Sequence, residues 1–202
     1  MKPLSLIIAF TPLIVFSLLS RVLPHGDIGV AGLVAAASAL IALVISRPVW
    51  PPKILTAISL VLFTAIAVLG FALSKNDDRW LATWGGAGIG LVIGLIILAL
   101  VPLMPFTEQF ARESTPQAYW GSPTFKKINR VLSAGWGAAI FAAGASRVAA
   151  AAIDGHTTRR LPETILGLVV PVVVIVYMLK FSKSYPDKVT HQEPAAGAPA
   201  GG

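Results

Sequence analysis

The chain has 202 residues, of which 55% are hydrophobic and only 12% charged, and its formal net charge is +7. Soluble globular domains use charged residues at about a quarter of their positions, so this composition excludes an ordinary soluble domain. The sequence contains no cysteine, which excludes disulfides, thiolate catalysis and cysteine-ligated metal centres. The basic residues lie mostly in short segments between apolar runs, a pattern that favours contact with anionic headgroups over nucleic acid binding.

Long apolar runs recur from one end of the chain to the other. A helix needs about 20 apolar residues to cross the hydrocarbon core of a bilayer, and these runs have that length. We therefore predict an all-α fold, a polytopic transmembrane helical bundle of about six spans that forms one domain over residues 1–181. The predicted spans cover residues 4–19, 28–45, 54–73, 83–104, 131–153 and 163–181. Residues 182–202 end in a stretch rich in Pro, Ala and Gly and are expected to form a disordered cytoplasmic tail.

The fourth predicted span carries three glycines at four-residue intervals, Gly86, Gly90 and Gly94. This spacing places them on one helical face and lets another helix approach closely. A dinucleotide-binding fingerprint is excluded here because the third glycine is misplaced and no strand precedes it. The predicted partner is a small-residue face on the fifth span, made of Ala138, Ala142, Ser146 and Ala150.

The longest polar interval of the chain, residues 105–130, separates the fourth and fifth predicted spans. We expect Thr107 to cap a short helix in which Glu108 and Arg112 form an i,i+4 ion pair. Phe106 and Phe110 share one face of that helix, which predicts an amphipathic turn lying on the cytoplasmic interface.

The second half of this interval combines aromatic residues with a cationic helix start. Ser122-Pro123 is a typical helix N-terminus, from which the helix is expected to run on into the fifth span. The candidate residues for contact with a partner or with lipid are Trp120, Lys126, Lys127 and Arg130. Two interpretations stay open for them, a belt at headgroup depth or a docking surface for another protein.

Arg147 is the charged residue that lies well inside a predicted span, about 9 Å from the nearer end of the fifth span. It is the candidate intramembrane polar site. Three roles are open to it: anchoring the helix at the interface, pairing with Asp154 or Glu163, or contacting an anion.

The side chains that usually carry catalysis or hold cofactors are not arranged for either role. His25, His156 and His191 lie in turns or in the tail, without the spacing of metal ligands. No serine stands in a nucleophile motif. We therefore expect no catalytic, cofactor-binding or metal site, and we do not expect an enzyme.

Lys and Arg are unevenly divided between the two sides that six spans define. Ten lie on the side of both termini and of residues 105–130, and five lie on the opposite side. Because positive charge favours the cytoplasmic side, both termini and the 105–130 interval are predicted to be cytoplasmic.

Several short motifs between residues 50 and 150 resemble one family. They are Asp77-Asp78-Arg79-Trp80, Trp84, Tyr119-Trp120, Phe125-Lys126-Lys127-Ile128-Asn129-Arg130-Val131-Leu132 and Trp136-Gly137. Their order is similar to that in the intracellular septation protein A family of bacterial inner-membrane proteins. The resemblance implies a multi-pass protein of the bacterial cytoplasmic (inner) membrane that serves envelope maintenance and division. The longer loop and the tail are departures from that family.

These inferences predict a non-enzymatic scaffold of the cell envelope and division apparatus with a cytoplasmic docking loop. Its expected partners are the lipid bilayer and other membrane or division proteins, with no nucleic acid. The alternative is a small-solute transporter or channel built around the glycine-rich fourth span, Pro171 and Arg147, which requires a polar cavity near the middle of the membrane.

Overall fold

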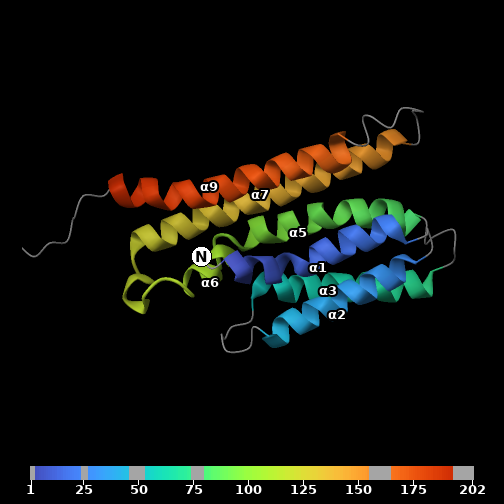
Figure 1. The fold of residues 1–202 in the computed structure, drawn as a ribbon, viewed down its shortest axis with the longest axis horizontal. Helices are drawn as coiled ribbons and strands as arrows, with labels where there is room; N and C mark the ends of the chain where they lie inside the picture. The colour runs from blue at the N-terminus through green and yellow to red at the C-terminus, as the bar shows by residue number, and fades with distance from the viewer. Residues whose placement is uncertain (1–2, 24–26, 46–52, 74–79, 155–164, 193–202) are drawn as a thin grey trace, which may run out of the picture.

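The computed structural model describes residues 3–23, 27–45, 53–73, 80–154 and 165–192, and within these ranges the chain forms helices and no strands (Figure 1). The first three helices are α1 (Pro3–Val22), α2 (Ile28–Ile45) and α3 (Ile54–Ala72). A π-helical turn, η1 (Leu81–Gly85), leads into α5 (Gly86–Leu100), and the short elements α6 (Phe106–Ala111) and η2 (Gln117–Tyr119) follow. The long helix α7 (Pro123–Asp154), the π-helical turn η3 (Ile165–Val169) and α9 (Val170–Gln192) complete the fold.

The structure confirms the predicted all-α fold and has the apolar helices of a multi-pass membrane protein. α1 is 20 residues long and contains the apolar stretch Ile8–Ser20. Its residues Ala9 and Phe16 are buried, so α1 packs within the bundle at the place of the predicted first span. Among the described residues, five helices are long and apolar enough to cross a bilayer: Ile28–Ile45, Ile54–Ala72, Thr83–Leu100, Pro123–Ile153 and Ile165–Thr190.

The long helices run back and forth along a common direction (Figure 1). The start of α1, the start of α7 and the end of α9 lie towards one end of the bundle together with α6, and we call this the α6 end. The end of α1, the start of α2 and the end of α7 lie towards the opposite end. The path of the described helices therefore has the alternation that the six-span prediction requires.

The helices form two packed groups. The first contains α1, α2 and α3, and in the second α7 packs between α5 and α9. The groups meet where the rings of Phe10 in α1 and Trp136 in α7 lie 5.5 Å apart between centroids. The core is apolar, and Phe16, Phe63 and Ile93 are each at most 1% exposed.

Glycines bring the backbones of α5 and α7 into contact. A Cβ atom on Gly94 would lie 2.5 Å from the backbone nitrogen of Phe141, and one on Gly90 would lie 2.9 Å from the Cα atom of Gly144. Since real Cβ atoms do not approach so closely, only glycine fits at these positions without a shift of the helices. The predicted packing role is confirmed for Gly90 and Gly94.

The face of α7 that meets these glycines is not the predicted one. It carries Gly137 and Gly144, whereas Ala138 is exposed. Ser146 faces η3 instead, where its hydroxyl donates a 2.7 Å hydrogen bond to the carbonyl oxygen of Leu166. The predicted face begins at Ala138, one residue after Gly137. Because each residue turns an α-helix by about 100°, the predicted face points to a different neighbour.

The last helix is longer than the sequence predicts. The predicted span ends at residue 181 and is followed by a disordered tail, but α9 continues to Gln192. The rings of Phe181 and Tyr185 stack with centroids 5.1 Å apart, and the Trp136 indole nitrogen donates a 2.9 Å hydrogen bond to the Ser182 hydroxyl. These contacts support the extension over residues 182–192, while residues 193–202 lie outside the described part of the chain.

Candidate functional site

α6 is inserted against the long helices, whereas the sequence predicts a turn lying on the membrane interface. Phe106, Thr107 and Phe110 are buried, and the two phenylalanine rings meet edge to face with centroids 6.1 Å apart. Thr107 does not cap this helix, because Pro105 occupies the N-cap position. The shared face of the two phenylalanines is therefore as predicted, but it packs inside the protein.

Thr107 joins α6 to α7 through a buried hydrogen-bond cluster. Its hydroxyl donates to the Asn129 carbonyl oxygen at 2.8 Å, and its backbone nitrogen donates to the Ser133 hydroxyl at 3.1 Å. All three residues are at most 1% exposed. The Asn129 side-chain nitrogen donates to the carbonyl oxygen of Phe125 at 2.8 Å, and its Oδ1 atom has no partner among the described residues. Leaving a buried polar group without a hydrogen-bond partner destabilises the folded protein, so these hydrogen bonds hold α6 against α7.

The other side of α6 is held to the start of α3. Lys53 Nζ lies 2.9 Å from Glu113 Oε1, and these side chains are 7% and 13% exposed. The same Nζ lies 4.9 Å from the centre of the Phe110 ring. Gln109 Oε1 accepts a 2.9 Å hydrogen bond from the backbone nitrogen of Ile54, one of the N–H groups that the start of a helix leaves unpaired. No local sequence pattern connects residues 53 and 113, so sequence reasoning missed this contact.

Arg112 and Trp120 make contacts within residues 105–130 that stabilise the rest of this segment. The predicted i,i+4 pair is present, with Arg112 Nη2 2.6 Å from Glu108 Oε1. The Arg112 guanidinium lies 5.0 Å from the centre of the Trp120 ring, and the indole nitrogen donates a 2.9 Å hydrogen bond to the Thr115 carbonyl oxygen. The candidate contact residue Trp120 is therefore half-buried and stabilises the loop itself.

The remaining candidate contact residues lie on the outer side of the α7 start. Ser122 caps this helix as predicted, because its hydroxyl accepts a 3.2 Å hydrogen bond from the backbone nitrogen of Phe125. Phe125 is buried. The exposed set, which we call the basic platform, consists of Tyr119, Lys126, Lys127 and Arg130.

Arg147 lies in the last third of α7 and faces α1. It is half-buried, and its Nη1 atom lies 3.5 Å from the Ser17 hydroxyl oxygen. This polar contact connects the two groups of helices. Of the predicted partners, Glu163 and the side chain of Asp154 lie outside the described residues.

Metal-ligating side chains do not gather in the part of the chain that the structure describes. No group of three or more His, Cys, Asp or Glu residues there could hold a metal ion. His25, His156 and the side chain of His191 lie outside the described residues.

The chain matches no family model, no curated protein and no solved structure. Membership of the septation protein A-like family therefore stays a prediction from short motifs. Of the motif residues, Asp77, Asp78 and Arg79 lie outside the described residues. Trp136 is 4% exposed and packs in the core, so this motif residue has a structural role.

Proposed function

We propose that this protein is a non-enzymatic scaffold of the bacterial cytoplasmic membrane whose basic platform docks an acidic segment of another envelope or division protein. The observation that carries the proposal is the two-sided construction of residues 105–130. On the inner side, buried polar contacts attach this segment to α3 and α7. On the outer side, the tyrosine and the three cations of the platform are exposed.

Attachment to two long helices prepares the segment for binding. A surface that is already ordered loses less conformational entropy when a partner binds. The ion pair between Lys53 and Glu113 adds resistance to disruption, because removing one partner of a buried pair costs about 3–5 kcal/mol. The three cations of the platform lie on α7 itself, so their backbone is already helical in the absence of a partner.

The charge of the platform sets the chemistry of the partner. Residues 123–137 contain no Asp or Glu, and Lys126, Lys127 and Arg130 are exposed there. Complementary charge speeds association and excludes partners of like charge. The larger number of basic residues on this side supports a cytoplasmic location by the positive-inside rule. The resemblance to the septation protein A-like family supports a role in the envelope.

Two other features of the described residues support a scaffold rather than a solute transporter. Transporters bind their solutes near the bilayer midplane, in sites formed by broken helices. The groove that α7 and α9 form is lined by apolar side chains and one tyrosine, and Arg147 is engaged with Ser17. Neither feature provides a polar cavity for a solute.

The test of docking is the double substitution Lys126→Glu with Lys127→Glu in the full chain. Chemical cross-linking in intact membranes, followed by quantitative mass spectrometry, compares the captured proteins with those of the unaltered protein. We expect the cross-links to acidic segments to be lost, because like charges placed across an interface cost several kcal/mol.

The matched control is Lys183→Glu with Lys188→Glu, which makes the same charge change on exposed positions of α9, outside the platform. This control is expected to keep the partners. Equal capture by all three proteins would contradict the docking proposal. Loss of capture in both variants would also contradict it, since overall charge and not the platform would then decide binding.

A further inference from the structure

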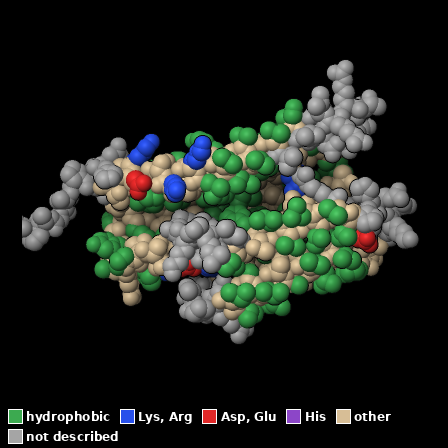
Figure 2. Space-filling model, in the orientation of Figure 1, with side chains coloured by type: hydrophobic (Ala, Val, Ile, Leu, Met, Phe, Trp, Pro, Cys, Tyr) green, Lys and Arg blue, Asp and Glu red, His purple; other side chains and the backbone are tan. Residues whose placement is uncertain are grey.

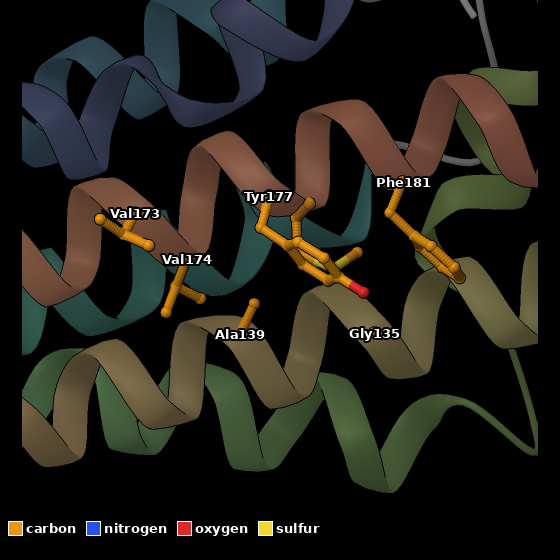
Figure 3. A pocket seen from close by; sticks show the side chains of 7 residues that line it. Gly135, Ala139, Val173, Val174, Tyr177 and Phe181 are labelled. Atoms are coloured by element: carbon orange, nitrogen blue, oxygen red, sulfur yellow. The ribbon is translucent and has the colours of Figure 1, made fainter.

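A groove runs along the interface between α7 and α9 (Figure 3). Its volume is about 460 Å³. Val173 and Tyr177 are 59% and 66% exposed, so the groove opens on the outer surface of the bundle, where lipid would meet the protein. Gly135 and Ala139 of α7 form one wall, and Val174, Met178 and Phe181 complete the wall contributed by α9.

The groove exists because small residues of α7 face large residues of α9 while hydrogen bonds hold the two helices in place. Figure 3 shows Tyr177 directed from α9 towards α7 near Gly135. The end of the Met178 side chain occupies the space beside this glycine, where a Cβ atom would lie 2.9 Å from its Cε. The hydrogen bond from Trp136 to Ser182 holds one end of the interface. The hydrogen bond from the Ser146 hydroxyl to the carbonyl oxygen of Leu166, in η3 directly before α9, holds the other end. The groove is therefore a fixed feature of this interface.

The length and place of the groove match one leaflet of a bilayer. From Val173 to Phe181 the helix rises about 12 Å, at roughly 1.5 Å per residue. Half of a hydrocarbon core is about 15 Å thick. Phe181 lies on the side of the groove nearer the α6 end, since α9 ends there. The groove thus belongs to the leaflet on the α6 side.

Basic side chains surround the groove where it ends at Phe181. Lys180 and Lys188 are exposed and lie on the side of α9 on which the groove opens, three residues after Tyr177 and seven residues after Phe181 respectively. Lys183 is exposed too, but two residues turn an α-helix by about 200°, so it lies on the face away from Phe181. Figure 2 shows Lys and Arg side chains gathered over this part of α9, with an acidic group beside them. The sequence of α9 contains three lysines, Lys180, Lys183 and Lys188, and one acidic residue, Asp187. The headgroup end of the groove is therefore positively charged.

We propose that the groove binds one acyl chain of an anionic phospholipid and that Lys180 and Lys188 hold its phosphate. A hydrocarbon chain gains dispersion contacts from walls that otherwise face an unfilled hollow. Each lysine near the headgroup is expected to raise the preference for an anionic lipid by about fivefold. A second copy of the chain suits the groove less, because a two-fold contact along α9 would bring the lysines of both copies together.

The test uses the full chain in phosphatidylcholine nanodiscs that contain a lipid with a photoactivatable group on its acyl chain. One probe has a phosphatidylglycerol headgroup and the other a phosphatidylcholine headgroup, and labelled residues are mapped by mass spectrometry. We expect the anionic probe to label residues 135–139 and 173–181 in preference to the exposed face of α3. The zwitterionic probe should label the same residues more weakly.

Two variants with matched controls separate the groove from its charge. Gly135→Leu adds a large side chain to the α7 wall and pushes the flexible end of Met178, which its Cβ atom would approach to 2.9 Å, into the groove, so it should abolish the labelling. Gly88→Leu makes the same change where a Cβ atom meets nothing within 4 Å, and it should leave the labelling intact. Lys180→Gln with Lys188→Gln should lower labelling by the anionic probe about fivefold per lysine, whereas Lys183→Gln should not.

Three results would overturn the proposal. Labelling spread evenly over all lipid-facing helices would show that the groove has no preference for a chain. Groove labelling that survives Gly135→Leu would show that the lipid binds elsewhere. Since the sequence has no cysteine, Val173→Cys reports on a second copy, and rapid formation of disulfide-linked dimers in membranes would assign the groove to that copy.

Discussion

The two interfaces that α7 makes use glycine in different ways. At the interface with α5, a Cβ atom on Gly94 would lie 2.5 Å from the backbone nitrogen of Phe141. At the interface with α9, a Cβ atom on Gly135 would lie 2.9 Å from Cε of Met178, the end of a flexible side chain. Where glycine faces backbone, the helices touch. Where it faces a long side chain, that side chain fills the space beside the glycine and keeps the two backbones apart. A glycine in an apolar helix therefore indicates close packing only when its partner also presents backbone.

The same difference separates a structural contact from a candidate binding site. The α5–α7 interface leaves no room for another molecule around its glycines, and its stability comes from packing. The α7–α9 interface is held by side-chain hydrogen bonds near its ends and is open between them. One helix thus carries a closed interface on one face and an open groove on another.

Gly94→Ala is expected to have the largest effect on stability. The new methyl group would meet the Phe141 backbone, which cannot yield unless the helices separate, so we expect a net loss of about 2 kcal/mol in the free energy of unfolding. Circular dichroism during titration with sodium dodecyl sulfate in mixed micelles measures this loss. The control is Gly88→Ala, where the methyl group meets nothing within 4 Å. Equal stability of the two variants would contradict the close contact of α5 and α7.

Trp136→Phe is expected to have a smaller effect, because it removes the hydrogen bond to Ser182 and keeps most of the ring packing. We expect a loss of about 1 kcal/mol in the free energy of unfolding. Amide hydrogen exchange should also become faster in residues 182–192, which this bond holds to α7. Ser182→Ala breaks the same bond, so the double variant should lose little more than either single variant. Fully additive losses would show that the two residues act independently.

Gly135→Ala is expected to have the smallest effect. The Met178 side chain can rotate away from the new methyl group, so the free energy of unfolding should change by no more than about 0.5 kcal/mol. The same titration as for Gly94→Ala measures it. A loss as large as that of Gly94→Ala would mean that the two interfaces are equally closed, and the contrast between them would be wrong.

Features that depend on neighbours along the chain were predicted correctly. The apolar runs predict the long helices, Ser122 predicts the start of α7, and the spacing of Glu108 and Arg112 predicts their ion pair. In each case the interacting groups lie within a few residues, so the sequence carries the whole signal. Longer-range features were missed. Thr107 bonds to α7 and does not cap α6, and Lys53 reaches Glu113 across the bundle.

The sequence by itself therefore determined a multi-pass helical membrane protein, because its segments are long and apolar enough to cross the hydrocarbon core of a bilayer. It also determined that the span containing Gly90 and Gly94 would pack closely, since four-residue spacing places small residues on one face. Only the tertiary structure decided which face of α7 those glycines meet, where α6 inserts and that a groove remains beside α9. Those outcomes depend on the rotation of each helix and on contacts between distant residues, which no local spacing encodes.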